Sequence, residues 1–397
     1  MNILFLTHRF PCPPDRGDRI RSYHIIKFLS KRHNIFLASV DESIPSSIHL
    51  NCMKEFCKAV IFYQIPRKKQ MLKACCYLPT CVPLSLPLFY NRRLYKDVKN
   101  LLSKEKIDLI FTYCVSMAPY TEEFSDIPKV IDFIDSDSQK WLDYAATTKS
   151  IYKFIYLREG FLLRRYEKKV AKLAQHAFVA SKREEEIFKR YIKTCPITTV
   201  LNGVSIPRYI KKHPSKDINI VFVGVMDYWP NVDAVTFFSK EVFPKIKKAF
   251  PNAKFFIVGK NPCEQVQQLS NISGVEVTGF VPDVKDYLLS ATLCVVPLRI
   301  ARGIQNKLLE AMAMKLPVVA TSAATQGIMA KDQKDLLIAD NPDDMAEKII
   351  RLIKDKRLQE ELSNNAFWYI KRYHDWEQNL KILEDIIVDI YKKYGQR

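Results

Sequence analysis

Residues 293–321 read LCVVPLRIARGIQNKLLEAMAMKLPVVAT, and this stretch indicates how the chain around it folds. The apolar run Leu293–Val296 predicts a strand that ends at Pro297, and a second β-branched run follows further on. Between the two runs lie a loop and a helix-forming segment that carries Lys307 and Glu310. A strand, a loop, a helix and a strand in this order predict a parallel sheet. The loop and the helix start then lie at the carboxyl edge of the sheet, where open α/β folds bind ligands.

The start of this helix is suited to an anion. Its first N–H groups lack internal partners and the helix dipole is positive there, so a phosphate can sit beside Arg299 and Lys307. Glu310 lies on the same helix face as Lys307, and its carboxylate suits a neutral partner such as the hydroxyls of a ribose. Together these residues predict a nucleotide diphosphate site. On spacing alone, Lys307 and Glu310 are equally consistent with an ordinary surface ion pair.

The segment resembles the sugar-nucleotide site of GT-B glycosyltransferases of family 4. In that family a Pro-Leu-Arg opening, a Gly, a Lys and a Glu before Ala-Met-Ala recur at these spacings, and the matching residues are Pro297, Leu298, Arg299, Gly303, Lys307 and Glu310. Many members carry two glutamates eight residues apart, and Arg302 stands at the first of these positions. The resemblance implies a donor site for a nucleotide sugar, with Arg302 changing the contacts to the sugar ring.

The composition sets the scale of the molecule. A chain of 397 residues with 48% hydrophobic side chains suits two domains of about 200 residues, each with its own core. No apolar run reaches the roughly 18 residues of a membrane-spanning helix, and the opening NILFLT predicts a strand rather than a signal peptide. The ten cysteines lack metal-site spacing, so we expect reduced thiols in a cytoplasmic protein.

The charge of the chain is uneven. The net charge is +19, and residues 1–200 hold 34 Lys and Arg against 20 Asp and Glu, whereas the remainder hold 28 against 23. A basic first half predicts an anionic partner, either a lipid surface or a phosphorylated acceptor. Nucleic acid is not expected, because no zinc-finger spacing, aromatic RNA-binding signature or helix-turn-helix pattern accompanies the charge.

The first strand, Asn2–Thr7, leads into the loop HRFPCPPDRGDRIRSYH at residues 8–24. Gly17 allows close approach of the backbone to a ligand, and three arginines can hold phosphate: Arg9, Arg19 and Arg21. A solvated basic loop with an aspartate cap is the alternative, and His8 is interpreted as structural. The wording of this loop resembles a branch of family 4 that is associated with exopolysaccharide and exosortase (PEP-CTERM) loci, which favours the binding role.

An acidic cluster follows a predicted strand in KVIDFIDSDSQKW, residues 129–141. Its Asp-Ser-Asp is similar to a metal-binding Asp-x-Asp, but it lies far in sequence from the phosphate site that a metal would have to bridge, so we expect no metal. The family resemblance implies that Asp135 or Asp137 contacts the acceptor or the transferred sugar, as a base or an electrostatic stabiliser. The alternative is that Asp137 caps the following helix.

Two regions of the first half suit a membrane surface. Between Pro66 and Lys96 there is no acid, and seven basic residues flank the proline-broken segment YLPTCVPLSLPLFY: Arg67, Lys68, Lys69, Lys73, Arg92, Arg93 and Lys96. This segment can lie on anionic lipid or fold against its own domain. An amphipathic helix is predicted over residues 151–174, with Phe154 and Phe161 in its apolar stripe and a basic face that is either solvated or turned to lipid.

The second half continues the family pattern. Asn202, Gly203 and Val204 end the first domain, and the resemblance adds four residues to the donor site: Gly224, Gly279, Gly303 and Asn306. We therefore predict an acceptor domain over residues 1–205, a linker over 206–217 and a nucleotide-sugar domain over 218–374. A terminal helix over 375–397 either crosses back to the first domain or packs on the second.

These features predict an α/β protein of GT-B type, with two Rossmann-like domains facing across a cleft. The resemblance implies a retaining, metal-independent glycosyltransferase that needs no cofactor, in which Arg299 and Lys307 stabilise the leaving diphosphate. We expect a membrane-associated, lipid-linked acceptor in cell-surface or exopolysaccharide synthesis, and a cytoplasmic protein that can bind the inner face of the cell membrane. A sugar-nucleotide epimerase and a non-catalytic basic scaffold remain alternatives. A Rossmann dehydrogenase is excluded, because no Gly-x-Gly-x-x-Gly follows any predicted strand.

Overall fold

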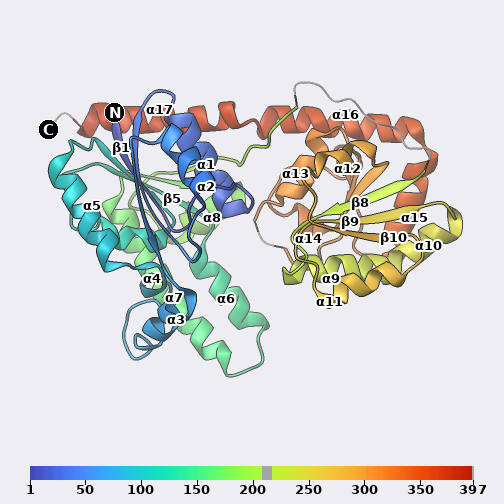
Figure 1. Ribbon diagram of the computed structural model, residues 1–397, viewed down its shortest axis with the longest axis horizontal. Coiled ribbons are helices and arrows are strands. Elements are labelled where there is room, and N and C mark those ends of the chain that lie inside the picture. The colour runs from blue at the N-terminus through green and yellow to red at the C-terminus, as the bar shows by residue number, and fades with distance from the viewer. Residues whose placement is uncertain (208–216, 302, 396–397) are drawn as a thin grey trace. The chain divides into compact units, whose positions relative to one another are not determined.

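The computed structural model describes residues 1–207, 217–301 and 303–395, and the chain divides into two compact units. The first unit comprises Met1–Leu201 together with Glu377–Arg397, and the second comprises Asn202–Trp376. Most of the predicted linker and Arg302 lie outside the described residues. Each unit is built on its own parallel sheet flanked by helices (Figure 1), so the predicted α/β class is confirmed.

The first sheet has seven strands in the order β3-β2-β1-β4-β5-β6-β7. Its strands are β1 (Asn2–Thr7), β2 (Asn34–Asp41), β3 (Ala59–Gln64), β4 (Leu109–Tyr113), β5 (Lys129–Ile134), β6 (His176–Val179) and β7 (Ile197–Thr199). The side chains of Leu4, Phe5 and Leu6 are fully buried. Strands covered on both faces read as continuous apolar runs, which explains why β1 has the bounds that the sequence predicts.

Helices cover both faces of this sheet. They are α1 (Gly17–Leu29), α2 (Ser47–Phe56), α3 (Arg67–Cys75), α4 (Ser85–Phe89), α5 (Arg92–Lys104), α6 (Asp137–Thr147), α7 (Tyr152–Leu173), α8 (Lys182–Tyr191) and the last helix α17 (Trp376–Tyr394). Most of α17 belongs to the first unit, where Arg32 donates two hydrogen bonds of 2.6 Å to the carboxylate of Glu384.

Helix α7 differs from its predicted apolar stripe. The predicted helix is present, but two members of its apolar stripe are not buried: Phe154 is 72% exposed and Phe161 is 61% exposed. The buried face instead carries the carboxylates of Glu159 and Glu167, which are 2% and 0% exposed. These acids can be buried because backbone N–H groups satisfy them, those of Leu84 and Ser85 for Glu159 and that of Ser138 for Glu167.

The second sheet has six strands in the order β10-β9-β8-β11-β12-β13. Its strands are β8 (Asn219–Val223), β9 (Lys254–Val258), β10 (Val275–Gly279), β11 (Leu293–Val296), β12 (Val318–Ala320) and β13 (Leu337–Ile338). Its helices are α9 (Trp229–Phe237), α10 (Phe243–Ala249), α11 (Glu264–Gln267), α12 (Lys285–Ser290), α13 (Asn306–Ala313), α14 (Ser322–Thr325), α15 (Pro342–Lys354) and α16 (Lys356–Tyr373). A single hydrophobic cluster fills this unit.

The strand order of each sheet reverses at one point, between β1 and β4 in the first unit and between β8 and β11 in the second. The connections that leave the two central strands at such a point run to opposite faces, and a crevice opens at the carboxyl ends of the strands. Most residues predicted for a site follow or end a strand of these sheets or lie in the first turn of the next helix, whereas Arg21 and Glu310 lie one turn further into α1 and α13. No helix among the described residues is long and apolar enough to cross a membrane.

Candidate functional site

The site of the second unit is assembled from the ends of β8 and the starts of α9 and α13. Lys307 in the first turn of α13 donates a short hydrogen bond from Nζ to the Oδ1 atom of Asn231 in α9. The same ammonium lies 4.4 Å from the centre of the Phe222 ring. Gly224 follows β8 and lies against both: a Cβ there would be 2.8 Å from Asn231 Nδ2 and 3.2 Å from Lys307 Nζ. The position of Lys307 therefore requires a residue without a side chain at 224.

Lys307 and Glu310 sit in surroundings that disfavour their charged forms. Burial lowers the pKa of Lys307 to about 7, although the charges of Cys294 and Glu310 oppose this shift. Burial also raises the pKa of Glu310 to about 7, and the positive charges of Lys307 and Lys285 only partly offset it. Within the described part of the chain no carboxylate forms an ion pair with Lys307. An ammonium held by an amide oxygen and a ring face is poised to gain an anionic partner.

Arg299 is placed differently from the prediction that it shares an anion with Lys307. Its guanidinium bonds the carboxylate of Asp233 in α9, with Nε 2.9 Å from Oδ2 and a second short contact from Nη2. The hydrogen bond that Arg299 donates to Asp233 raises the pKa of Arg299, and 51% of the Arg299 side chain is exposed. Residues two apart on a helix point to different sides, so Asn231 and Asp233 anchor the two cations separately.

The other predicted donor residues surround the start of α13 or lie at a strand end. Asn306 is the first residue of α13, and its Oδ1 atom is buried without a hydrogen-bond partner among the residues described. Gly303 and Gly279 have φ of +62° and +68°, values that favour glycine. Beside Gly279, at the end of β10, no atom lies within 4 Å of a Cβ position. A buried acceptor and open backbone leave room for a ligand with hydroxyl groups.

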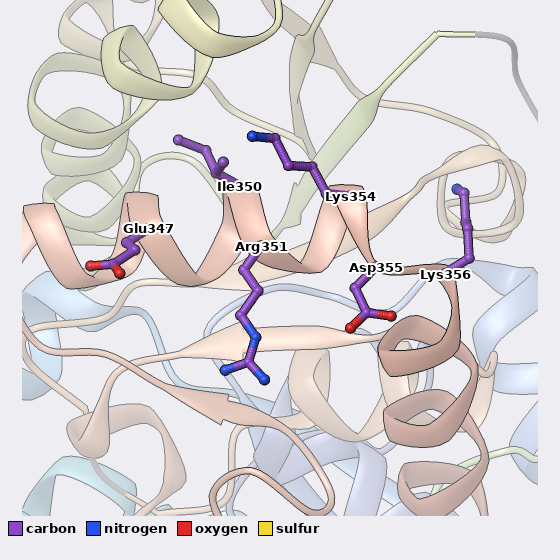
Figure 2. Close-up of a pocket in the computed structure, with 6 residues that line it drawn as sticks. All are labelled: Glu347, Ile350, Arg351, Lys354, Asp355 and Lys356. Atoms are coloured by element: carbon purple, nitrogen blue, oxygen red, sulfur yellow. The ribbon is translucent and has the colours of Figure 1, made fainter.

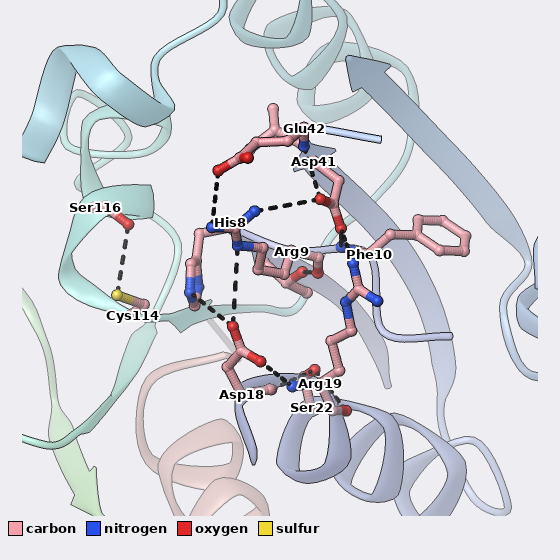
Figure 3. Close-up of polar contacts among 12 residues, drawn as sticks. His8, Arg9, Phe10, Asp18, Arg19, Ser22, Asp41, Glu42, Cys114 and Ser116 are labelled. Atoms are coloured by element: carbon pink, nitrogen blue, oxygen red, sulfur yellow. Dashed lines mark hydrogen bonds and ion pairs between the residues drawn. The ribbon is translucent and has the colours of Figure 1, made fainter. Parts of the chain in front are cut away.

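In the first unit, the loop after β1 carries its arginines in ion pairs (Figure 3). Arg9 lies 3.4 Å from Asp41 and 3.1 Å from Glu42, and Arg19 lies 2.9 Å from Asp41 and 3.1 Å from Asp15. Asp41 is only 2% exposed and also accepts a 3.0 Å hydrogen bond from the N–H of Phe10. The positive charge predicted to hold phosphate is thus already neutralised by carboxylates.

Arg21 is not part of an open phosphate loop, so this assignment is wrong. Its side chain is fully buried, with Nε 2.7 Å from Asp132 Oδ2 and Nη1 2.7 Å from the carbonyl oxygen of Val200. It ties α1 to β5 and to the end of β7. Gly17 is the exposed first residue of α1.

The backbone is strained where β4 and β5 end. Cys114 and Ile134 have φ of +74° and +68°, a region that a β-branched residue rarely enters. The N–H of Ile134 is held by a 3.0 Å hydrogen bond to Asp132 Oδ1, and the N–H of Cys114 by a 2.9 Å bond to the Asp132 carbonyl oxygen. Each such residue costs about 1–3 kcal/mol, and such strain clusters at functional sites. Here the turn directs the chain into Asp135.

Asp135 follows this turn, and a substantial part of its surface is exposed to solvent. Desolvation of its carboxyl group by surrounding protein atoms raises its pKa to about 7, helped by the negative charges of Glu184 and Asp137. Asp137 begins α6, but the cap of that helix is Ser136, whose Oγ accepts a 3.2 Å hydrogen bond from the N–H of Gln139. The alternative prediction that Asp137 caps the helix is therefore wrong, and its carboxylate instead lies 3.8 Å from the Sγ of Cys114.

Three groups near these strand ends were not predicted as site residues: His8, Glu167 and Glu184. His8 lies at the end of β1, 3.8 Å from Asp18, and its pKa is lowered, first by burial and then by Arg9, while Asp18 and Asp137 oppose the shift. Glu184 accepts from the N–H of Ser136 and Glu167 from that of Ser138, at 2.7 and 3.1 Å, which fixes the start of α6. Asp41 is the last residue of β2, so its place at the carboxyl edge of the sheet is a signal that could have found it. Asn231 lies in the first turn of α9, and nothing in the sequence marks it as the partner of a distant lysine.

A separate hollow lies on the second unit where α15 ends and α16 begins (Figure 2). It is lined by Glu347, Ile350, Arg351, Lys354, Asp355 and Lys356. The charged side chains among them are exposed, and none of the predicted site residues takes part. This hollow is a feature of the helix surface and does not belong to the sites at the strand ends.

Comparisons with known proteins agree with this geometry. Residues 217–355, which contain the Gly224, Lys307 and Glu310 site, match the family model described as Glycosyl transferases group 1. An uncharacterized glycosyltransferase of Methanocaldococcus jannaschii is 26% identical over 303 residues, or 73% of this chain and 77% of that protein. An uncharacterized 44.6 kDa protein in the cps region of Klebsiella pneumoniae is 26% identical over 189 residues, 44% of this chain. The chain spans about half (49%) of that relative's length.

Solved structures confirm the predicted GT-B fold. Sucrose-phosphate synthase from Thermosynechococcus elongatus is similar with a TM-score of 0.71 at 16% identity, over 99% of this chain and 100% of that one. Anabaena HepE in complex with UDP has a TM-score of 0.67 at 15% identity, over 98% and 100%. WaaG, a glycosyltransferase involved in lipopolysaccharide biosynthesis, has 0.64 at 16%, over 96% and 99%. Together with the family model, these findings support the predicted family and a transferase as the enzyme class, and the exosortase-associated branch stays a prediction.

Proposed function

We propose that this chain is a metal-independent, retaining glycosyltransferase that moves a sugar from a nucleotide diphosphate sugar to a membrane-associated saccharide acceptor. The observation that carries the proposal is the group of Gly224, Asn231 and Lys307, which places a cation without an ion-pair partner among the described residues at the start of a helix. This group lies at the switch point of a sheet, inside the segment that matches the glycosyltransferase model.

The donor diphosphate would lie on the first turn of α13. Its negative charge supplies the partner that Lys307 lacks, and it favours the protonated ammonium over the neutral amine. During transfer, the bond between the anomeric carbon and the β-phosphate oxygen breaks, and the electron pair stays on the phosphate. Lys307 and the positive end of α13 stabilise that developing charge, which is the largest catalytic contribution expected of this site.

The nucleoside part of the donor would use the neutral groups beside the cation. Glu310, one turn after Lys307 and with a raised pKa, can accept from or donate to a ribose hydroxyl. The buried Oδ1 atom of Asn306 can accept another hydroxyl hydrogen. HepE was solved with UDP and with UDP-glucose, so uridine diphosphate sugars come first among the donors to test.

The acceptor would be activated by the first unit. Asp135 has a pKa near 7, so its carboxylate is available at neutral pH and basic enough to take the proton of an acceptor hydroxyl. The acceptor oxygen then forms the new bond to the anomeric carbon on the face from which the diphosphate leaves, as retention of configuration requires. We propose a lipid-linked acceptor at the inner face of the cell membrane, in cell-surface or exopolysaccharide synthesis; the relative in a cps region and the net charge of +19 support it.

A thermal-shift panel of UDP-, GDP- and ADP-sugars tests the donor site. One class should stabilise the wild type, by about 2.7 kcal/mol at a hundred times Kd, because the ligand binds only the folded state. Lys307→Ala and Glu310→Ala should lose this shift and still fold. Lys240→Ala, which removes an exposed lysine of the same unit, is the matched control and should keep it. Equal shifts in all four proteins would refute the proposed site.

A further inference from the structure

We propose that one end of the first unit, formed by α3, the loop that follows it and the start of α7, docks on a bilayer of anionic phospholipid. We call this region the basic apolar end. The proposal deepens the proposed function, because it assigns the membrane contact to particular residues. Only the biological purpose of this membrane contact rests on the proposed function.

Large apolar side chains are concentrated at the basic apolar end. Residues 71–78 and 144–161 contain eight of the 17 exposed large hydrophobic side chains found among the described residues. The most exposed of them are Leu72 at 72%, Ile151 at 78% and Phe154 at 72%, with Phe161 at 61%. Exposed apolar side chains gathered in one region mark an interaction site, since a monomer gains nothing from leaving them in water.

Hydrogen bonds bring the two segments together. Arg158 of α7 donates from Nη2 to the carbonyl oxygens of Tyr77 and Val82, at 2.9 and 3.1 Å, in the loop after α3. Phe154 precedes Arg158 by four residues and Phe161 follows it by three, so all three share one face of α7. The two exposed phenylalanines therefore flank the loop, and α3, α4 and α7 lie at the same end of the unit in Figure 1.

The charge at the basic apolar end has one sign. Residues 66–96 contain no acid, and residues 144–165 contain only Glu159, which is 2% exposed and accepts from the N–H groups of Leu84 and Ser85. The exposed cations at this end are Arg67, Lys68, Lys69, Lys149, Lys153 and Arg165.

Apolar side chains ringed by cations match a bilayer with anionic headgroups, where the former enter the headgroup boundary and the latter stay at the phosphates. A second copy of the chain is a poorer occupant, because a two-fold contact would set this positive surface against itself.

Flotation of the full chain with vesicles tests the inference. The wild type should bind vesicles of phosphatidylcholine mixed with phosphatidylglycerol, bind phosphatidylcholine alone far less, and detach at high salt. Phe154→Ser with Phe161→Ser should weaken partitioning by about tenfold for each phenylalanine removed, since each loses most of an apolar side chain from the lipid. Lys68→Gln with Lys69→Gln should weaken it by about fivefold for each charge.

Trp368→Ser is the matched control, because Trp368 is 63% exposed on α16 of the second unit. It should float like the wild type. Equal binding to both kinds of vesicle, or a loss that is no larger for the phenylalanine pair than for Trp368→Ser, would overturn the proposal. A change of oligomeric state in the phenylalanine pair, with vesicle binding unchanged, would overturn it in favour of a contact between copies.

The donor thermal shift separates this inference from the proposed function. The phenylalanine and lysine pairs should keep the stabilisation by the nucleotide sugar, since α3 and α7 lie outside the donor domain. A wild type that is stabilised by donor but binds neither kind of vesicle would remove the docking surface and leave the transferase standing. Vesicle binding without any donor shift would do the reverse.

Discussion

The switch points of the two units are alike in topology and opposite in their use of charge. At the first, Arg9 and Arg19 face Asp41 and further carboxylates, so the positive charge is cancelled where the strands end. At the second, Lys307 faces an amide oxygen and a ring. The first unit belongs to the more basic half of the chain, yet the arginines at its switch point are neutralised by carboxylates. The net charge does not show which cations are already paired with carboxylates, and an anionic ligand binds best to a cation that is not.

The difference suits a division of labour. A crevice with paired arginines offers carboxylates such as Asp135 to a neutral hydroxyl acceptor without gripping a phosphate of its own. A crevice with an unneutralised ammonium attracts the diphosphate. Part of the surplus positive charge of the first unit lies on exposed residues of the basic apolar end, such as Lys68 and Lys153. The following predictions test this contrast, beginning with the largest expected effect.

Arg21→Met should test whether the first crevice depends on its buried ion pair. Removing the guanidinium leaves the buried carboxylate of Asp132 without its ion-pair partner, and breaking such a pair costs about 3–5 kcal/mol. We expect a large loss in the denaturant midpoint of the first unit, with donor affinity kept by the folded protein. Arg190→Met, at an exposed arginine of the same unit, should change stability little. A cost below about 1 kcal/mol would show that Asp132 finds another partner.

Asp135→Asn should separate the two crevices by function. The amide cannot take a proton, so the transfer rate should fall about 100-fold or more. The donor thermal shift should stay at the wild-type value, because Asp135 lies in the other unit from Lys307. Steady-state transfer assays with a saturating donor measure the effect. Asp126→Asn, at an exposed aspartate, serves as the control. An unchanged rate for Asp135→Asn would move the acceptor chemistry elsewhere.

The donor affinity should depend on pH through Lys307. A phosphate binds the protonated ammonium, and burial lowers the pKa of this group in the free protein from 10.5 to about 7. Affinity should therefore be highest below pH 7 and fall as the pH rises above it, approaching about tenfold for each pH unit. Calorimetric titrations with a nucleotide sugar from acid to alkaline pH measure this. In Lys307→Arg the guanidinium stays charged, so the fall in affinity that comes from Lys307 should disappear and leave the contribution of Glu310, whose pKa is also about 7. Equal profiles for the wild type and Lys307→Arg would contradict the assignment.

The sequence was able to place what depends on neighbours in the chain. The buried strands β1 and β11 have their predicted bounds, and α13 begins one residue before Lys307. It failed where partners are distant. Arg21 pairs with Asp132, 111 residues away, and nothing in a sequence separates such an arginine from one in solvent. Lys307 depends on Asn231, 76 residues earlier, and only the fold shows that the two meet.

The apolar stripe predicted for α7 is only partly buried, for a related reason. Periodicity assumes that the buried face of a helix is apolar. Here Glu159 and Glu167 are buried because distant N–H groups bind them, and Phe154 and Phe161 are exposed. A helix pattern that contradicts its own burial often marks a surface with a second partner, and this mismatch is what makes the basic apolar end visible.

Gly224→Ala should sharpen the account of the second crevice. The new Cβ would be 2.8 Å from Asn231 Nδ2, so the amide or the Lys307 ammonium must shift by a few tenths of an ångström. Because Gly224 and Asn231 position the ammonium of Lys307, we expect donor affinity to fall about fivefold with a modest loss of melting temperature. Asn231→Ala should show the same direction. An affinity equal to the wild type in both variants would mean that the ammonium finds the phosphate without this support.

Arg299 should show the smallest effect, and it decides whether the second crevice contains one available cation or two. The side chain is half exposed and already bonded to Asp233, and a surface pair of this kind contributes about 0–1 kcal/mol to stability. If Arg299 stays with Asp233 when donor binds, Arg299→Gln should change affinity by less than about threefold. Asp233→Asn then becomes the informative variant: it frees the guanidinium and should leave affinity unchanged. A rise in affinity for Asp233→Asn, together with a tenfold loss for Arg299→Gln, would show that the arginine leaves its carboxylate for the phosphate. The two crevices would then differ in how firmly their arginines are held rather than in how many cations they expose.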